Sequence, residues 1–422
     1  MLRVTMAAVL LAATASAGCT SAATTTTEAS LSGTGPITIA TGKLDTGSYL
    51  PALIRQWNAA HPDQDVTLIP LPDESDDQLA QLVANLQSKS SLYDVMSLDV
   101  VWIAEFAVNG WITPLNPTSF PLGDLLRPAV KTTQYQGKMY AAPFTSNAEL
   151  LYYRKDILAG RGPPRTWAQL ANLAMTLAPR HGMAGYAGQL AAYEGLTVNF
   201  AEAVQSAGGS ILSHDWTRVT LNSAAAREGL SFLSDGLQQG WIPRGALTYD
   251  EAASQQAFEA GKLLFLNNWP YVYGVASVPG PGNKVAGKFG VAPLPGPGGP
   301  GSSSLGGADL AISAFSRHPV TALAFIKFLT SLPSERQILV DASLPPVWDQ
   351  LYADPALIRR FPYLPVLEKA ILSAKPRPEI PNYAQLSLAI SSTIHEALAT
   401  NQPVNSTITT LSGELSSVIR NG

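Results

Sequence analysis

Amide and aromatic side chains follow directly after an apolar run that spans residues 263–266. In order, they are Asn267, Asn268, Trp269, Pro270, Tyr271 and Tyr273. Amide groups form paired hydrogen bonds with neighbouring hydroxyl groups, and flat aromatic rings lie against C–H faces. This combination is typical of a site that binds a sugar. The alternative is a turn that is capped by aromatic rings and packs against the next helix.

The residues before this run predict how those side chains are positioned. The spacing of Ala257, Phe258 and Ala260 predicts a short amphipathic helix, and Gly261 ends it. The apolar run then predicts a buried strand. Because ligand sites are concentrated in loops at the ends of strands, we expect residues 267–273 to lie at a site rather than in the core.

The length and composition of the chain predict a folded protein with two lobes. Its 422 residues exceed the size at which a single hydrophobic core stops growing. Hydrophobic residues make up 46% of the chain and charged residues 14%, which indicates a globular protein with few surface charges. The net charge is −4, and Lys and Arg are scattered rather than clustered. We therefore expect no nucleic-acid partner.

The amino terminus predicts export and attachment to a membrane. Residues 1–18 combine one arginine, an apolar run and small residues, which is the pattern of a signal peptide too short to remain as a transmembrane helix. The sequence Ser-Ala-Gly-Cys that ends at Cys19 resembles a bacterial lipobox, in which the cysteine is lipidated. Cys19 is the only cysteine, and a free thiol is the alternative. We expect a lipoprotein on the outer face of the cytoplasmic membrane.

Residues 19–35 are expected to form the lipidated amino terminus and a flexible tether. Residues 20–35 are mainly Ser, Thr, Ala and Gly, and they bury too little apolar surface to fold. A disordered mature terminus without a tethering role is the alternative.

The next part of the chain alternates predicted strands with predicted helices. Strands are expected at 36–40, 66–70 and 93–98, and helices at 49–60, at 78–88 and through Trp102. This order predicts a parallel α/β sheet. Residues 41–48 and 99–102 then lie at the carboxyl ends of strands, where ligands of such sheets bind.

A second α/β region is expected beyond the strand predicted at 137–143, with residues 140–144 as the candidate hinge. Glycine and proline over 279–304 predict a surface loop, residues 305–313 a strand, and residues 320–329 a helix. The mostly helical remainder is broken at 375–381. We assign residues 36–143 and 289–330 to the N-terminal lobe, and residues 144–288 and 331–422 to the C-terminal lobe.

Motifs for common catalytic chemistries are absent from the sequence. There is no GxGxxG after the first predicted strand, no Walker lysine loop, no HExxH and no GxSxG. The five histidines lie far apart, so we expect neither a metal nor a cofactor. A glycosidase with two carboxylates remains open. Alternatively, Asp45, Asp99, Glu194 and Glu251 accept hydrogen bonds from hydroxyl groups without doing chemistry.

Several segments together carry a resemblance to a known family. They are residues 94–102, 140–143 with Asn147, 152–154, 268–270, 306–312, and Arg377 with Tyr383 downstream. The mature chain resembles the extracellular solute-binding proteins of ABC sugar importers of the maltose and trehalose class, and within it the actinobacterial trehalose-binding lipoproteins. The resemblance implies an α/β, two-lobed periplasmic-binding-protein fold of type II, with a ligand cleft between lobes joined by hinge segments.

The resemblance also implies a set of sugar-binding residues. Those that align best are Asp99, Asn147, Glu251, Trp269, Gly307 and Arg377, and the looser placements are Asp45, Tyr193 and Glu194. Carboxylates and amides would bond hydroxyl groups, the arginine would donate in one plane, and the indole would stack. For three of them a structural role is the alternative. Asp99 could cap the following helix, Glu251 could favour the start of its helix, and Trp269 could belong to the core.

Three classes of function follow. The first is a monomeric, non-enzymatic binding protein that delivers a disaccharide, with trehalose favoured, to ABC permease subunits. Maltose, maltooligosaccharides or another glycoside are its alternative ligands. The second is a secreted two-carboxylate glycosidase, and the third is an adhesive surface lipoprotein without a small ligand.

Overall fold

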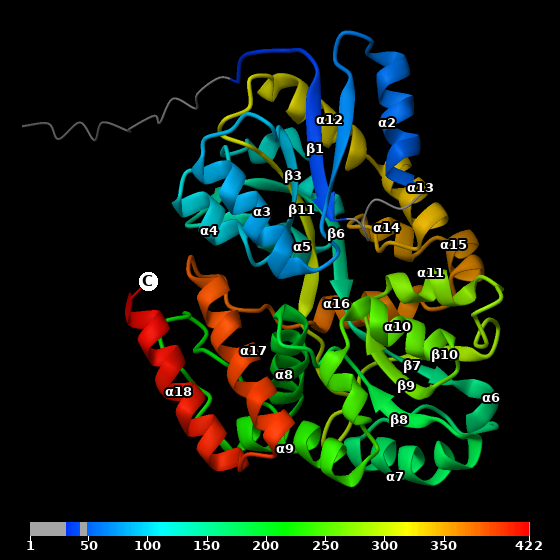
Figure 1. Cartoon of the computed structure of the whole chain (residues 1–422). Helices are drawn as coiled ribbons and strands as arrows, with labels where there is room; N and C mark the ends of the chain where they lie inside the picture. Colours follow the sequence, from blue (N-terminus) through cyan, green and yellow to red (C-terminus); the bar gives the residue numbers. More distant parts are fainter. Residues whose placement is uncertain (1–30, 43–48, 422) are drawn as a thin grey trace, which may run out of the picture. The chain divides into compact units, whose positions relative to one another are not determined.

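The structure is a computed structural model that describes residues 31–42 and 49–421 (Figure 1). The described residues from Ser32 onward belong to one compact unit. Cys19 and Asp45, the predicted lipidation site and one predicted ligand contact, lie outside the described residues. No helix in the described part of the chain has both the length and the apolar character needed to cross a membrane.

Helices and strands alternate over residues 37–108, and the only elements described after residue 312 are helices. The strands are β1 (Ile37–Gly42), β2 (Val66–Leu71), β3 (Val95–Asp99), β4 (Gln134–Tyr135), β5 (Lys138–Met139), β6 (Ala141–Ala148), β7 (Leu150–Arg154), β8 (Ala184–Ala187), β9 (Leu263–Asn268), β10 (Phe289–Ala292) and β11 (Leu305–Ile312). The helices are α2 (Tyr49–Ala60), α3 (Ser75–Gln87), α4 (Ile103–Val108), α5 (Arg127–Thr132), α6 (Lys155–Leu158), α7 (Trp167–Leu177), α8 (Glu194–Ser206), α9 (Ala224–Gln239), α10 (Glu251–Glu259), α11 (Tyr271–Ser277), α12 (Pro319–Leu329), α13 (Leu332–Ala342), α14 (Asp349–Tyr352), α15 (Pro355–Arg360), α16 (Leu364–Ser373), α17 (Tyr383–Thr400) and α18 (Val404–Asn421). Short 3-10 turns lie at Pro117–Ser119, Leu122–Asp124, Pro179–His181 and Arg244–Thr248.

The first sheet has the strand order β2-β1-β3-β11-β6. Strand β1 runs parallel to β2 and β3, as the alternation of strands and helices predicts. Strand β11, which is distant in sequence, runs antiparallel between β3 and β6. Helix α2 has the predicted bounds and packs against β2, because its apolar side chains repeat on one face.

The second sheet has the order β10-β7-β9-β8 and lies below the first in Figure 1. Helices α7 and α10 pack against β8 and β9. A helical layer of α8, α9, α17 and α18 lies beside this sheet, with α17 in contact with both α8 and α18. Each sheet thus has its own covering helices.

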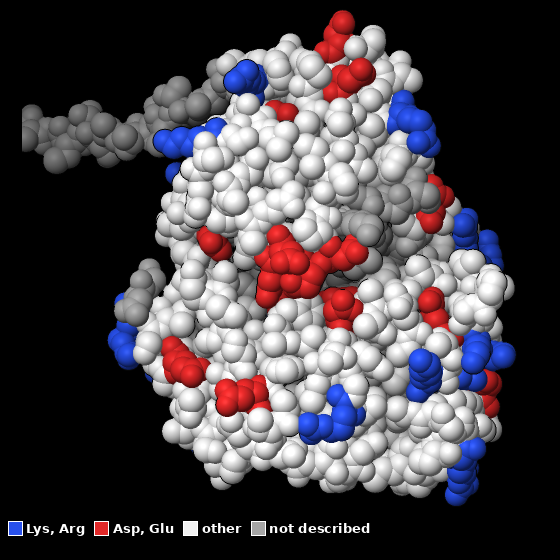
Figure 2. Space-filling model, in the orientation of Figure 1, with Lys and Arg blue, Asp and Glu red and all other residues white. Residues whose placement is uncertain are grey.

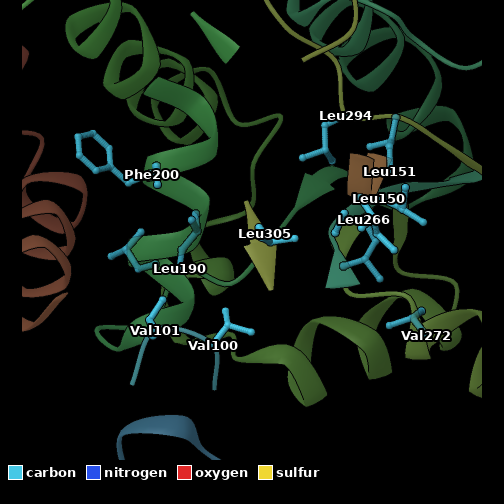
Figure 3. Packing of buried hydrophobic residues seen from close by; sticks show 14 of the residues in the cluster. Val100, Val101, Leu150, Leu151, Leu190, Phe200, Leu266, Val272, Leu294 and Leu305 are labelled. Carbon is cyan, nitrogen blue, oxygen red and sulfur yellow. The ribbon is translucent and has the colours of Figure 1, made fainter. Parts of the chain in front are cut away.

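Apolar side chains from both sheets join one buried cluster. Figure 3 shows Leu150 and Leu151 of β7 close to Leu266 of β9, with Leu305 of β11 between them and Phe200 of α8. The core therefore continues through the region where the chain passes from one sheet to the other.

The chain passes between the sheets at separate points. Strand β6 belongs to the first sheet and β7 to the second, so the change falls at Glu149 rather than at the predicted hinge over 140–144. A second change lies between β10 and β11. A third lies between α16, which packs on β6, and α17, and there Lys375 exchanges backbone hydrogen bonds of 2.9 and 2.8 Å with Ser303 and Leu305.

Two elements differ from the predicted division of the chain. Strand β10 pairs with β7, so the residues from 289 to 292 belong to the second sheet and not to the N-terminal lobe. The many glycines and prolines around this strand led to the prediction of a loop, and β10 was therefore not predicted. Helix α13 packs against α2, and α16 packs against β6, although both follow residue 331. Helical periodicity alone does not indicate which sheet a helix covers.

A pair of buried carboxyl groups lies where the chain changes sheet. Glu149 is 1% exposed at the first change, and Glu202 of α8 is 3% exposed. Glu202 accepts hydrogen bonds from Ser303 Oγ (3.1 Å) and from the Ser304 backbone N–H (2.9 Å), which precede β11. It also accepts from Asn267 Nδ2 at 2.9 Å. Burial first, and then the negative charge of Glu202, raise the pKa of Glu149 well above its usual range.

The raised pKa leads to a prediction for Glu149→Gln. As the pH rises above about 4.5, unfolded wild type releases the Glu149 proton before the folded protein does, so its free energy of unfolding falls by up to about 1.4 kcal/mol per pH unit. Glu202 and Glu251 strengthen this effect because their negative charges also act on Glu149. The variant lacks the titrating group, so its stability should fall less steeply between pH 5 and 8 in urea unfolding.

Glu228→Gln, on the exposed side of α9, is the matched control and should keep the wild-type slope. Equal slopes in wild type and Glu149→Gln would show that Glu149 is not held protonated by the fold.

Candidate functional site

A cleft of about 1020 Å³, part of it open to solvent, lies between the two sets of strand ends. It is lined by Asp73, Ser75, Gln78, Ser97, Asp99, Trp102, Thr145, Asn147, Glu194, Gly195, Val198, Glu251, Trp269, Tyr271, Gly306, Gly307, Ala308, Leu344 and Arg377. Strands of the first sheet and the ends of α8, α10 and β9 all contribute to it. Carboxylates, amides and indole rings from both sets of elements converge on this space, as polar and aromatic groups do in sites for small ligands.

Acidic side chains gather near the start of α3, in the middle of the face that Figure 2 shows. Glu74 accepts hydrogen bonds from the backbone N–H groups of Asp76 and Asp77, which fixes the first turn of the helix. Burial and the neighbouring charge of Glu74 raise the pKa of Asp76 to about 7. Asp73, just before α3, lines the cleft, so acidic side chains border the cleft on the side of α3.

The structure brings most of the predicted site residues together. The cleft is lined by Asp99, Asn147, Glu194, Glu251, Trp269, Gly307 and Arg377. Tyr193 lies behind the cleft wall and donates a hydrogen bond of 2.7 Å from its hydroxyl to Glu251 Oε2. Contact of these residues with a sugar stays a prediction.

Arg377 links two carboxylates from different elements. Its Nη2 donates to Asp99 Oδ1 at 2.8 Å, at the end of β3, and its Nη1 donates to Glu194 Oε1 at 2.5 Å, at the start of α8. Arg377 is 2% exposed. A buried guanidinium is stable only when its charge is paired, so this bridge fixes the ends of β3 and α8 relative to each other.

Glu194 is held by further donors. Tyr383 Oη donates to Glu194 Oε1 at 2.6 Å, and Ser387 Oγ donates to Glu194 Oε2. Burial raises the pKa of Glu194, while the positive charge of Arg377 opposes this rise. Helix α17 thereby joins the bridge.

Asp99 is not the N-cap of α4, which is Trp102, and its contact with a ligand stays a prediction. Its Oδ1 accepts a hydrogen bond of 3.1 Å from the Val101 backbone N–H, in the turn that leads into α4. The same carboxylate binds Arg377 and lines the cleft. Asp99 is therefore oriented from two sides.

Glu251 is the first residue of α10, and the pKa of its carboxyl group is raised. Burial raises its pKa to about 7, although the hydrogen bond from Tyr193 lowers it. At neutral pH both the protonated and the ionised form are present. The side chain can therefore donate to or accept from a hydroxyl group.

The end of β9 differs from the prediction. The strand continues through Asn268, and Asn267 and Asn268 are buried away from the cleft. Asn268 Nδ2 donates to the Glu251 carbonyl and to Ser254 Oγ, both at 3.0 Å. Asn267 binds the Glu202 carboxyl and Asn268 holds the backbone of Glu251 and Trp269, so neither amide faces the cleft. Trp269 and Tyr271 do line the cleft, whereas Tyr273 stacks on Tyr363 with ring centroids 4.1 Å apart.

Gly307 is required by the backbone. Its φ is +128°, in the region that disfavours side chains, and a Cβ atom there would lie 2.1 Å from the Thr145 carbonyl oxygen. The glycine lets β11 pass close to β6 at the cleft.

Several other residues that line the cleft were not among the predicted contacts. Asp73, Ser75 and Gln78 follow β2, and Thr145 lies within β6. Trp102 falls in the range 99–102 that was expected where ligands bind, although it was not named as a contact. Asp73 and Ser75 were detectable, because the signal that indicated Asp45 and Asp99, a polar residue after a predicted strand, is also present after β2. Leu344 and Val198 carry no such signal.

Within the described residues, no three His, Cys, Asp or Glu side chains lie together in a way that could hold a metal ion. The cleft offers carboxylates, two amides, an arginine and indole rings. These groups bind hydroxyl groups and sugar faces.

The comparisons with known proteins agree with this architecture. Residues 41–334 match the family model described as bacterial extracellular solute-binding protein. A probable ABC transporter-binding protein of Deinococcus radiodurans is 32% identical over 382 residues, which cover 84% of this chain and 86% of the relative.

Solved structures are also similar. Maltose-bound MalE3 of T. maritima is 32% identical, with a TM-score of 0.86, over 91% of this chain and 99% of that chain. The GacH receptor of Streptomyces glaucescens, solved unliganded and with acarbose, is 24% identical, with a TM-score of 0.82, over 92% of this chain and 99% of that chain. The predicted two-lobed α/β fold of type II is confirmed, and the chain belongs to the bacterial extracellular solute-binding protein family.

Proposed function

We propose that this protein is the substrate-binding component of an ABC sugar importer and that it closes its two lobes on a disaccharide. The observation that carries the proposal is the cleft, where Glu251, Asn147 and Trp269 lie on strand ends and helix starts from both sheets. A ligand that touches both sets favours the arrangement in which all contacts are made.

The polar groups that line the cleft can form hydrogen bonds with the hydroxyl groups of a sugar. Asn147 Oδ1 is buried and has no hydrogen-bond partner among the described residues, so a ligand hydroxyl or a water is needed to satisfy it. Glu251 can exchange roles as donor and acceptor, since its pKa is about 7. Trp102 and Trp269 supply aromatic faces for the sugar ring.

Trehalose is the ligand that we place first, on the resemblance to the trehalose-binding lipoproteins. Maltose is the second candidate, because the T. maritima structure with 32% identity holds maltose. The predicted contacts are Asp99, Asn147, Glu194, Glu251, Trp269, Gly307 and Arg377 in the cleft, with Tyr193 behind Glu251 and Asp45 outside the described residues.

We further propose that the protein acts outside the cell as a monomer, is anchored through a lipid on Cys19 and delivers its ligand to permease subunits. The family description supports the extracellular location. The pattern of residues 1–19 supports the anchor.

Titration calorimetry with trehalose and with maltose tests the function. Wild type should bind one of them without releasing glucose, and Trp269→Ala should bind roughly thirtyfold more weakly, because a lost stacking face costs about 2 kcal/mol. Trp167→Ala is the matched control, since Trp167 stacks on Phe232 away from the cleft, and it should bind like wild type.

Each other class of function gives a different result in that experiment. Released glucose would support a glycosidase, and the absence of any heat with both sugars would support an adhesive lipoprotein. Unchanged affinity in folded Trp269→Ala would show that this ring does not bind the sugar.

The anchor is tested by Cys19→Ser in the native organism or a bacterial host that lipidates exported proteins. Wild type should be found with the membrane fraction, whereas the variant should be released. If both forms are released to the same extent, the lipobox assignment is wrong.

A further inference from the structure

Gly306 of β11 lies under the indole ring of Trp269. A Cβ atom added at Gly306 would lie 2.6 Å from Cζ3 and 2.7 Å from Cη2 of that ring. Carbon atoms that are not bonded to each other approach to about 3.5–4.0 Å. A methyl group at this position is therefore incompatible with the observed position of the ring, which must move by about 1 Å.

The backbone itself does not require glycine at this position. Positive φ values occur at Gly307 and at other glycines of the described chain, but not at Gly306. Gly306 pairs with Asn147 of β6, whose Cβ would lie at 3.5 Å from an added Cβ, an ordinary contact. The ring of Trp269 is thus the group that excludes a side chain.

The backbone that carries Trp269 cannot shift easily to relieve the contact. The Trp269 N–H donates to Asn268 Oδ1 at 2.7 Å, and the Trp269 carbonyl accepts a hydrogen bond of 2.9 Å from Tyr152 Oη. Asn268 is in turn bonded to Ser254 Oγ at 3.0 Å. A methyl group at residue 306 would therefore displace the ring rather than the loop.

We propose that Gly306 is a positioning residue that seats the Trp269 ring against β11 and so sets the aromatic face that the ligand meets. The inference rests on the proposed function, because it concerns how the same cleft holds a sugar. Trp269 comes from the end of β9 in the second sheet, and its seat comes from the first sheet. Since Gly306 and Trp269 both line the cleft, a displaced ring changes the space that the sugar occupies.

The test is a double-mutant cycle on ligand affinity. Gly306→Ala should weaken binding of the sugar that wild type prefers by about tenfold or more, while thermal stability changes little because a side chain and not the backbone moves. In the Trp269→Phe background the added methyl should cost no more than about twofold, since the shorter phenyl ring does not extend to the positions of Cζ3 and Cη2.

Gly290→Ala is the matched control. Gly290 of β10 lies under the ring of Tyr153 in the same manner, with an added Cβ 2.4 Å from Cζ, but neither residue lines the cleft. This variant should bind the sugar like wild type. A loss equal to that of Gly306→Ala would show that a displaced aromatic ring perturbs binding wherever it lies.

A second readout needs no ligand. The tryptophan emission of the free protein should differ between wild type and Gly306→Ala, and the same substitution should leave the emission unchanged in the Trp269→Phe background. If wild type binds no sugar, the proposed function fails, but this readout still tests whether Gly306 positions the Trp269 ring. Wild-type affinity in Gly306→Ala, or equal losses in both backgrounds, would overturn the inference.

Discussion

The bridge that Arg377 forms between Asp99 and Glu194 is the interaction on which the arrangement of the cleft depends. A guanidinium that is 2% exposed needs both carboxylates, because leaving a buried charge unpaired costs about 3–5 kcal/mol. Asp99 ends β3 of the first sheet, and Glu194 begins α8 beside the second. The two lobes are therefore tied at the cleft by electrostatics as well as by the chain.

Other contacts extend this tie in both directions. Tyr383 connects the bridge to α17, and the backbone pairing of Lys375 with Ser303 and Leu305 connects it to the change of sheet before β11. Glu202 binds Ser303 and Ser304 next to that pairing. The polar core beneath the cleft thus links the segments in which the chain changes sheet with the residues that line the cleft.

Local sequence patterns predicted much of the fold. The bounds of α2 and the parallel pairing of β1 with β2 and β3 followed from periodicity, because these elements alternate regularly and end at turn residues. Strand β10 was missed, since its backbone pairing with β7 overrides a composition rich in glycine and proline. The hinge was placed too early, because β6 gives no sequence signal for the residue at which it leaves its sheet.

The candidate site was predictable only where a local sequence pattern or the family resemblance indicated a residue. Residues after strands, such as Asp99 and Trp269, were indicated by position, and Arg377 by the resemblance to the family. The buried roles of Asn267 and Asn268 were not, because the sequence does not show that Glu202 and Ser254 approach them from other elements. The contact between the Trp269 ring and Gly306 also joins residues from two sheets, so no local sequence pattern predicts it.

Small-angle X-ray scattering of the free protein and of the protein with saturating sugar tests the central claim most directly. A sugar that bridges strand ends of both lobes selects their closed arrangement. The radius of gyration should therefore fall when the sugar that binds in calorimetry is added, and an unrelated sugar should leave it unchanged. An identical radius with and without the bound sugar would contradict closure of the lobes on the ligand.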